Sequence, residues 1–342
     1  MTPAAPAPAA SAATLTVTDL SVRFEVEHAT VHAVNGVSFA VQRGQTVAIV
    51  GESGSGKSVT CLSVLRLLPR SARVTGSVQL DGRELLTLSE PEIRKVRGQG
   101  IGLVYQDPMA ALNPVRTIGA QVAEPLRLHL GLSRRAAAER AAELLGTVGI
   151  PSPRQQLRAY PHEFSGGMRQ RVVIAMAIAC EPRVLLADEP TTALDVSVQA
   201  QILELLKNLT TELGISLVLV SHDMSVVAGL ADDVLVMYGG YLAEQGDAVQ
   251  VFEHPAHPYT AGLLASIPDT APDPDAPLTG IAGQPPDMRT MPAGCVFAPR
   301  CPHAFGRCAQ QPPLEDRGPS HRAACWLGPE VNVGERVGLG AA

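Results

Sequence analysis

The sequence has no long apolar run and no excess of basic residues. Its longest unbroken apolar stretch is Val172–Cys180, nine residues between Arg171 and Glu181. A membrane-spanning helix needs about 20 such residues, so no transmembrane helix is expected. Lysine and arginine number 27 against 33 acidic residues, a formal net charge of −6. This charge leaves no basic footprint for nucleic acid, and we expect no nucleic-acid partner.

Lysine and arginine are absent from residues 1–13, which contain three prolines. A signal peptide begins with basic residues, so we expect a disordered tail instead. Prolines are rare in the body, with ten between residues 14 and 254 and fifteen from residue 255 onward. We therefore predict a regular α/β domain over 14–254, an irregular C-terminal segment over 255–330 and a tail over 331–342. An apolar fraction of 46% is enough for a substantial core, and no internal repeat is visible.

The octet GESGSGKS, residues 51–58, interrupts two apolar stretches. Residues 46–50 form a β-type run before it, and apolar residues recur at helical spacing after it, as far as Pro69. An ordinary glycine–serine turn lacks this strand–loop–helix context, in which backbone N–H groups and the helix dipole surround an anion. The octet therefore predicts a nucleoside triphosphate site, with Lys57 on the β- and γ-phosphates and Ser58 on Mg²⁺. The loop residues expected to bind ATP are Gly51, Glu52, Ser53, Gly54, Ser55, Gly56, Lys57 and Ser58.

A second apolar strand ends in two adjacent carboxylates, Asp188 and Glu189. Such a pair could be no more than a solvated turn. Beside a phosphate loop, however, the two acids suit different tasks: Asp188 the outer shell of Mg²⁺, and Glu189 the polarisation of the attacking water. The sequence thus predicts hydrolysis of the triphosphate.

A phosphate loop alone does not distinguish kinases, GTPases and transport ATPases, but the stretch FSGGMRQR, residues 164–171, does. Ser165 is a candidate N-cap, and two glycines lead into a helix, which makes a second anion-binding terminus without its own lysine. In this order the motifs resemble the ABC ATPase family over nearly all of residues 14–254. The resemblance implies an α/β fold with a mixed central sheet, an antiparallel β subdomain and a helical subdomain at about 107–180.

The same resemblance implies roles for three further residues. Gln106 matches the glutamine that touches Mg²⁺ and the attacking water, and Asp195 lies in a segment that matches the D-loop. His222, after an apolar strand, matches the histidine that contacts the γ-phosphate; outside this order of motifs it would be ordinary polar surface. Glu189, His222 and Gln106 are thus the expected catalytic residues.

Two positions depart from the common family pattern. Phe24 stands where a tyrosine usually stacks on adenine; its ring can stack equally well, but it is also a candidate core residue of a strand. Met168 replaces the usual glutamine of the signature, so we expect the contacts of Ser165 and Gly167 but not those of a glutamine side chain.

The resemblance also implies a pair of subunits. In the family fold the signature helix lies far from the phosphate loop of its own chain. The residues expected to complete the ATP site of a partner are Ser165, Gly166, Gly167 and Asp195. A second ABC ATPase subunit, identical or paralogous, is therefore an expected partner.

The C-terminal segment resembles the ATP-binding subunits of oligopeptide and dipeptide ABC importers. The similarity rests on the HPYT stretch, residues 257–260, and on the cysteine-rich stretch that follows. It implies two transmembrane permeases, an extracytoplasmic substrate-binding protein and a peripheral location on the cytoplasmic face of the plasma (inner) membrane. Related importers carry nickel, glutathione or sugars, so these cargoes, and a non-transport ABC ATPase, are the alternatives.

Four cysteines lie within 31 residues, namely Cys295, Cys301, Cys308 and Cys325. A reducing cytoplasm disfavours disulfides. Relatives in this importer family hold an iron–sulfur cluster at similar cysteines, so the resemblance implies a [4Fe–4S] cluster. A Zn²⁺ ion or four free thiols are the alternatives.

Overall fold

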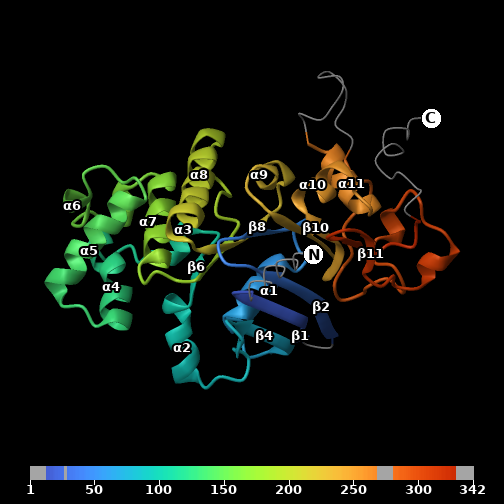
Figure 1. Ribbon diagram of the computed structural model, residues 1–342, viewed down its shortest axis with the longest axis horizontal. Coiled ribbons are helices and arrows are strands. Elements are labelled where there is room, and N and C mark those ends of the chain that lie inside the picture. Colours follow the sequence, from blue (N-terminus) through green and yellow to red (C-terminus); the bar gives the residue numbers. More distant parts are fainter. Residues whose placement is uncertain (1–12, 27–28, 268–279, 329–342) are drawn as a thin grey trace, which may run out of the picture.

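A twisted eight-stranded sheet forms the centre of the molecule (Figure 1). The computed structural model describes residues 13–26, 29–267 and 280–328. The sheet runs in the order β11-β12-β10-β9-β3-β8-β7-β6; β6, β7, β8, β3 and β9 are parallel and the other pairs antiparallel. Its strands are β3 (Thr46–Val50), β6 (Ile101–Val104), β7 (Val184–Asp188), β8 (Ser216–Ser221), β9 (Asp233–Tyr238), β10 (Tyr241–Asp247), β11 (Glu315–Gly318) and β12 (His321–Ala323).

The central strands β3, β7 and β8 are buried at every residue. Continuous apolar runs of this kind are typical of parallel strands covered on both faces. The parallel arrangement brings the carboxyl ends of β3, β6, β7 and β8 to one edge of the sheet, and the predicted phosphate loop, acidic pair and histidine follow these ends.

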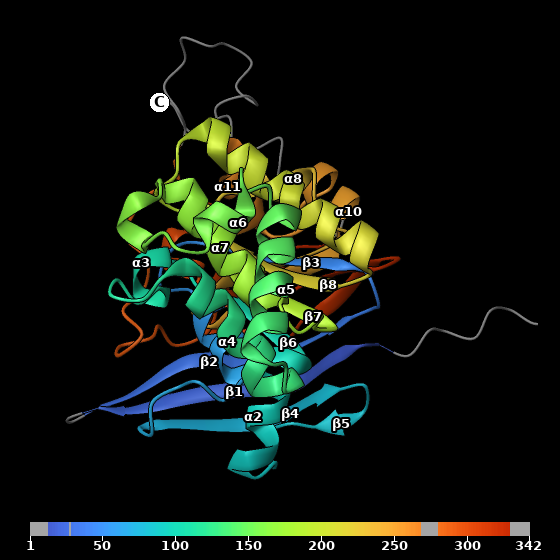
Figure 2. The same cartoon turned by 90° about the vertical axis from the view of Figure 1, so that its left-hand side faces the viewer.

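A four-stranded antiparallel sheet forms a second layer of the molecule (Figure 2). Its order is β2-β1-β4-β5, with β1 (Leu15–Val26), β2 (Ala29–Val41), β4 (Ala72–Leu80) and β5 (Arg83–Glu84). Its apolar face, helix α1 (Lys57–Val64) and helix α2 (Glu90–Gln99) share one core, which includes Leu15, Val22 and Ile93. The phosphate loop is thus fixed between two sheets.

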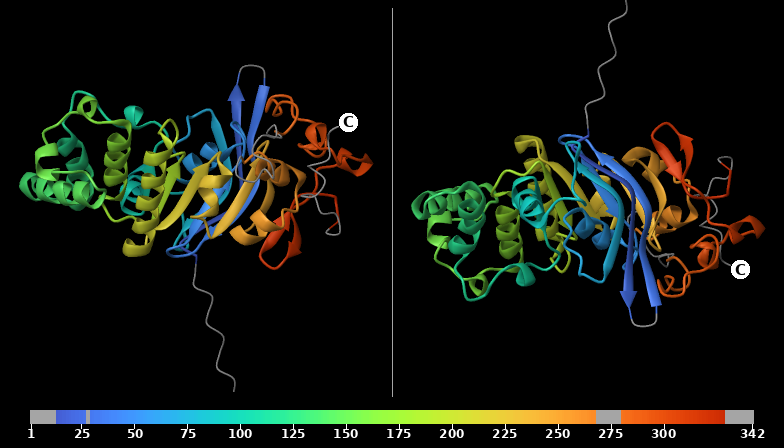
Figure 3. Two further views of the ribbon diagram at one scale, coloured as in Figure 1. Left: turned by 90° about the horizontal axis from the view of Figure 1, so that it is seen from above. Right: turned by 90° about the horizontal axis from the view of Figure 1, so that it is seen from below.

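The stretch of chain that connects β6 to β7 is mostly helical and forms one end of the molecule (Figure 3). Its helices are α3 (Pro108–Ala111), α4 (Ile118–Leu130), α5 (Arg134–Thr147), α6 (Pro153–Gln156), the 3-10 turn η1 (Pro161–Glu163) and α7 (Gly166–Ile178). Side-chain caps begin α4, α5 and α7, because Thr117, Ser133 and Ser165 each accept a hydrogen bond from a backbone N–H of the first turn. The helices occupy the range predicted for the helical subdomain, whose boundaries stay a prediction.

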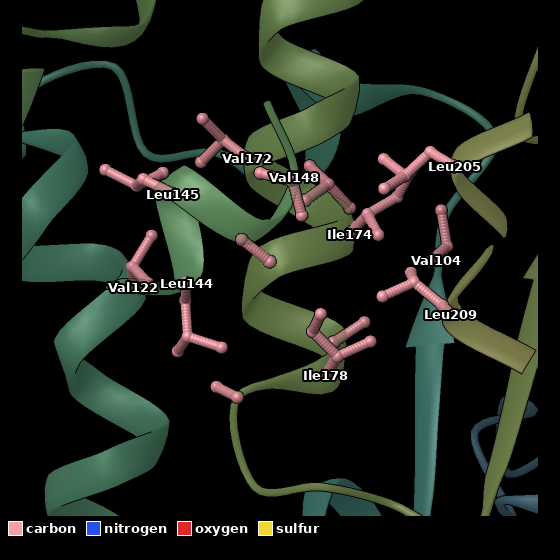
Figure 4. Packing of buried hydrophobic residues seen from close by; sticks show 14 of the residues in the cluster. Val104, Val122, Leu144, Leu145, Val148, Val172, Ile174, Ile178, Leu205 and Leu209 are labelled. Carbon is pink, nitrogen blue, oxygen red and sulfur yellow. The ribbon is translucent and has the colours of Figure 1, made fainter. Parts of the chain in front are cut away.

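One apolar cluster joins these helices to the central sheet (Figure 4). Ile174 on α7 belongs to this cluster together with Leu145 of α5, Val104 of β6 and Leu205 of helix α8 (Val196–Leu213). Because α7 contributes to both the helical bundle and the sheet, the start of α7 is held in a defined place relative to the sheet edge.

The helix after the phosphate loop is shorter than the sequence predicted. Apolar spacing extends to Leu68, but α1 ends at Val64. Arg66 adopts a left-handed φ of 53°, and the N–H of Leu67 donates to the carbonyl of Leu62. This pattern ends a helix locally, and periodicity does not signal it because the apolar positions continue past the turn.

The C-terminal segment was predicted to be irregular, but part of it is regular in the structure. Strands β11 and β12 extend the central sheet beyond β10, and the segment also holds helix α11 (Pro258–Ala265) and the turns η3 (Ala298–Arg300) and η4 (Gly306–Ala309). Tyr259 and Phe297 pack with Tyr238 of β9 in a shared core. The sequence of β11, EDRG, carries no apolar alternation, so only pairing with β12 makes it a strand.

Candidate active site

The phosphate loop joins β3 to α1 and is shaped by two glycines. A Cβ at Gly51, whose φ is 146°, would lie 2.2 Å from the carbonyl oxygen of Met237. A Cβ at Gly56, whose φ is 103°, would lie 2.5 Å from the carbonyl oxygen of Ala33. Both positions therefore require glycine, because the loop passes directly over neighbouring backbone.

Lys57 is held beneath this loop. The residue is only 4% exposed, and Nζ donates to the carbonyl oxygens of Gly51, at 2.7 Å, and Glu52, at 2.9 Å. Burial lowers the pKa of Lys57, while the negative charges of Glu189, Asp188 and Glu52 oppose that shift. The loop thus encloses a cation whose backbone partners can be exchanged for phosphate oxygens.

An open cleft of about 640 Å³ lies over the loop. It is lined by Ala33, Glu52, Ser53, Gly54, Ser55, Gly56, Lys57, Ser58, Val59, Gln106, Glu189, His222 and Met288. Three of these residues follow strand ends: Gln106 follows β6, Glu189 follows β7 and His222 follows β8. Most of the predicted ATP-binding and catalytic residues are therefore in one place.

Glu189 is the centre of the polar contacts in the cleft. Its Oε2 accepts hydrogen bonds from Gln106 Nε2 and Thr192 Oγ1, both at 2.9 Å, and lies 3.3 Å from His222 Nδ1. Glu189 has a left-handed φ of 45°, a strained conformation for this residue type, and its N–H donates to the carbonyl of Val220. All three side-chain contacts fall on Oε2, which leaves Oε1 as the acceptor that none of them uses.

Asp188 and Ser58 form a second polar pair beside Lys57. Ser58 Oγ donates to Asp188 Oδ1 at 2.8 Å, and Asp188 is 7% exposed. Burial, together with the charge of Glu189, raises the pKa of Asp188, against the hydrogen bond from Ser58 and the charge of Lys57. A hydroxyl and a carboxylate oxygen next to a phosphate site are the hard ligands that Mg²⁺ prefers. The donor set therefore fits a magnesium nucleotide.

The predicted partner-site residues lie together, away from this cleft. Ser165 begins α7 and Asp195 begins α8, each capping its helix. A Cβ at Gly166 would lie 3.4 Å from Leu194 Cδ2, and one at Gly167 only 2.4 Å from Val198 Cγ1. Among the described residues that line the cleft, none comes from these two helix starts.

Phe24 and Met168 differ from the other predicted positions. Phe24, on β1, is partly buried against the core below the antiparallel sheet, and the described lining of the cleft does not include it. Adenine stacking by Phe24 therefore stays a prediction, beside the alternative of a core residue. Met168 packs partly against the helical core, and its N–H donates to Ser165 Oγ.

The four C-terminal cysteines gather, but not as a recognisable metal site. Cys295 donates its N–H to the carbonyl of Cys308, and the other thiols help to raise the pKa of Cys301. Burial is the main cause of this shift, to about 11, and burial also raises the pKa of Cys295 and Cys325. Within residues 13–26, 29–267 and 280–328, no group of three or more His, Cys, Asp or Glu could hold a metal ion. The expected [4Fe–4S] cluster and the Zn²⁺ alternative are thus unsupported by the structure.

Sequence reasoning missed three residues beside the loop. Arg300 forms an ion pair with Glu52, the hydroxyl of Tyr259 accepts the N–H of Glu52, and Met288 lines the cleft. All three lie after residue 255. Tyr259 belongs to the HPYT stretch, which indicated the family but no contact with the phosphate loop. No local sequence pattern indicates that Arg300 or Met288 lies beside the loop.

This fold and site define an ABC nucleotide-binding cassette. The ABC transporter family matches residues 34–192, and the oligopeptide/dipeptide transporter C-terminal region matches residues 243–308. A dimeric structure of a post-hydrolysis state of the ATP-binding cassette MJ0796, bound to ADP and Pi, superposes with a TM-score of 0.62. It is 29% identical and covers 68% of this chain and 98% of its own.

Two relatives that match over most of their length indicate which group of ABC proteins the chain belongs to. The oligopeptide transport ATP-binding protein OppD of Escherichia coli (strain K12) is 48% identical, over 92% of this chain and 93% of the relative. The dipeptide transport ATP-binding protein DppD of Bacillus subtilis (strain 168) is 50% identical, over 92% and 94%. The chain therefore belongs to the family of ATP-binding subunits of oligopeptide and dipeptide ABC transporters, and is an ATPase of that transporter class. No helix in the part of the chain that the structure describes has the length and apolarity to cross a bilayer.

Proposed function

We propose that this chain hydrolyses ATP to power the import of dipeptides or oligopeptides through a membrane transporter. One observation carries this proposal: the same chain has both the cleft of an ABC cassette and the C-terminal region typical of oligopeptide and dipeptide transporters. Nickel, glutathione and sugars are alternative cargoes. They are outcomes of the transport test below.

The residues of the cleft divide the chemistry of hydrolysis. Lys57 and the N–H groups of the loop bind the β- and γ-phosphates, and His222 contacts the γ-phosphate. Glu189 accepts a proton from the attacking water, with Gln106 fixing the orientation of its carboxylate. Ser58 and Asp188 would hold Mg²⁺, which neutralises charge on the phosphates when bound. The water adds to the γ-phosphorus, the β–γ bridging bond breaks, and ADP and phosphate leave.

We further propose that two such subunits close on two ATP molecules. Ser165 and Asp195 are exposed at helix starts outside their own cleft, where a partner's nucleotide could reach them. The relative MJ0796 is described as dimeric and bound to ADP and Pi, which supports this arrangement. Loss of the γ-phosphate removes the contact that joins the subunits, so the pair opens.

The partners are two permeases and an extracytoplasmic binding protein, and the chain would sit on the cytoplasmic face of the membrane. Residues 107–114, after Gln106, would border the groove for a permease helix. Met109 within this stretch, and Tyr105 and Val115 on either side of it, are 45%, 44% and 80% exposed, which suits an apolar contact.

Reconstitution tests this function directly. The chain is assembled with its permeases and partner ATPase in proteoliposomes, and ATP-dependent uptake of labelled di- and tripeptides is compared with uptake of Ni²⁺, glutathione and sugars. We expect peptide uptake, abolished by Lys57→Ala and by Ser165→Arg. Uptake of another cargo alone refutes the peptide assignment, and unchanged uptake in both variants refutes the paired ATP sites.

The iron–sulfur cluster stays a prediction from the resemblance, and the geometry of the described residues does not support it. Anaerobic purification followed by iron and zinc analysis decides between the cluster, Zn²⁺ and free thiols. A thiolate-bound iron–sulfur cluster would also give a broad visible absorbance at about 400 nm. No function proposed here depends on the result.

A further inference from the structure

The C-terminal segment reaches into the ATP site through one arginine. Arg300 lies at the end of η3, and its guanidinium pairs with both carboxylate oxygens of Glu52, at 2.6 Å and 3.0 Å. The two residues are 248 positions apart in the chain. The Arg300 side chain is 5% exposed and that of Glu52 is 26% exposed, so the pair is largely shielded from water. Planar bidentate pairing of this kind fixes orientation as well as distance.

Arg300 is itself fully engaged. Besides Glu52, its guanidinium donates to the hydroxyl of Tyr238 and to the carbonyl oxygens of Ile281 and Ala282. A lysine has a single charged nitrogen and cannot reach this set of acceptors at once. The C-terminal segment and β9 therefore hold the Arg300 side chain in one position. Through its pair with Glu52, Arg300 in turn restricts the position of the phosphate loop.

The other polar groups of Glu52 are also bound. Its N–H donates to the hydroxyl of Tyr259 at 2.8 Å, and its carbonyl oxygen accepts from Lys57 Nζ at 2.9 Å. Tyr259 is completely buried, and its ring packs against the rings of Tyr238 and Phe297. Two contacts from the C-terminal segment thus meet on the residue that binds the phosphate-binding lysine.

A buried acid anchors the start of the segment to the sheet. Glu244 of β10 is completely buried; it accepts the N–H groups of Ala256, at 2.8 Å, and His257, at 2.9 Å, and lies 2.7 Å from His321 Nε2. Ala256 and His257 directly precede α11, and His321 begins β12. The frame that supports Tyr259 is therefore tied to the same sheet as the loop.

We propose that Arg300 is a positioning residue for ATP binding: through Glu52, and together with Tyr259, it sets the shape of the phosphate loop and the place of Lys57. The segment typical of peptide transporters is then a structural part of the ATP site. This inference rests on the ATP site described above and not on the cargo.

Loss of Arg300 frees the Glu52 carboxylate and leaves the loop held by fewer contacts. The loop must then become ordered when ATP binds, and the free-energy cost of this ordering lowers the affinity for ATP. The hydrolytic groups Glu189 and His222 stay in place. We expect Arg300→Met to weaken binding of AMP-PNP with Mg²⁺ about tenfold, equivalent to about 1.4 kcal/mol, and to raise the KM for ATP equally. The kcat should change less than about threefold, because Arg300 touches no reacting group.

The test uses the purified full chain, calorimetric titration with AMP-PNP and steady-state ATPase assays. Arg307→Met is the matched control, since Arg307 lies in the same segment and stacks on Trp326, 3.8 Å from the ring centre. Glu52→Gln and the double variant Glu52→Gln/Arg300→Met complete a cycle. We expect the double variant to bind no more weakly than Arg300→Met alone, because both changes break one contact.

Each outcome decides the inference. Wild-type affinity in Arg300→Met, an equal loss in Arg307→Met, or fully additive losses in the cycle would each overturn it. Where Arg300→Met does not fold, Arg300→Lys replaces it, with an intermediate loss of affinity expected and no loss counting against the inference. Failure of the wild-type chain to bind AMP-PNP would instead refute the ATP site itself.

Discussion

Replacing Glu189 with glutamine should stop hydrolysis without preventing ATP binding. Glutamine has nearly the same shape, so one side-chain oxygen can still accept from Gln106 Nε2 and Thr192 Oγ1. The NH₂ group then occupies the position of Oε1, the oxygen that those contacts leave unused. An amide nitrogen cannot accept a proton from water, so the proposed general base is lost while the contacts that order the site remain.

The expected magnitude follows from this single loss. A positioned general base contributes about 10²–10⁴-fold to a rate, so kcat should fall by that factor, or about 3–5 kcal/mol in activation free energy. Binding should change less than about threefold, because Lys57 and the loop are untouched. The variant is therefore expected to accumulate in an ATP-bound, dimeric form.

Phosphate release and size-exclusion chromatography with ATP and Mg²⁺ measure the two effects. Glu181→Gln is the control, since it neutralises a carboxylate that pairs at the surface with Arg140 and is 76% exposed. Such pairs contribute about 0–1 kcal/mol, so its turnover should match the wild type. Turnover of Glu189→Gln within threefold of the wild type would remove Glu189 from the role of base.

Three further predictions concern stability. Ile174→Ala, in the core that joins α7 to the sheet, should lower the free energy of unfolding by about 2–5 kcal/mol in urea titrations; no loss would mean that the core is not packed as described. Gly167→Ala should cost about 1–3 kcal/mol, since its Cβ would lie 2.4 Å from Val198 Cγ1; a second change, Val198→Ala, should restore much of it, and no rescue would exclude this clash as the cause. Burial, assisted by the charge of Arg317, lowers the pKa of His257 from 6.5 to about 3. Between these two pKa values the unfolded chain binds more protons than the folded chain, so the free energy of unfolding falls as the pH is lowered, by about 1.6 kcal/mol from pH 6.5 to pH 5. An equal pH dependence in His257→Gln would refute this cause.

Much of the ATP site was predictable because its parts are local. A phosphate loop is one continuous strand–turn–helix, and the caps Ser165 and Asp195 stand next to the helices they begin. The order of these motifs placed the chain in its family, which the comparisons confirm. The gathering of Gln106, Glu189 and His222 at one sheet edge follows from parallel strands whose carboxyl ends meet there.

The predictions for the C-terminal segment were less accurate, for a physical reason. Apolar periodicity reports burial along one element, whereas β12 is a strand because it pairs with β10, and β11 because it pairs with β12. The four cysteines lie close in sequence, yet ligand geometry depends on side-chain positions that spacing does not define. The choice of an iron–sulfur cluster over Zn²⁺ therefore rested on the resemblance.

The sequence by itself determined the chemistry: a lysine-bearing phosphate loop, an acidic pair and a signature helix, each encoded within a few consecutive residues. Only the tertiary structure decided that Arg300 and Tyr259 hold Glu52. That contact spans most of the chain, and its two sides carry no shared local pattern. It exists because the sheet, the buried Glu244 and the aromatic rings around Tyr259 bring the segment against the loop.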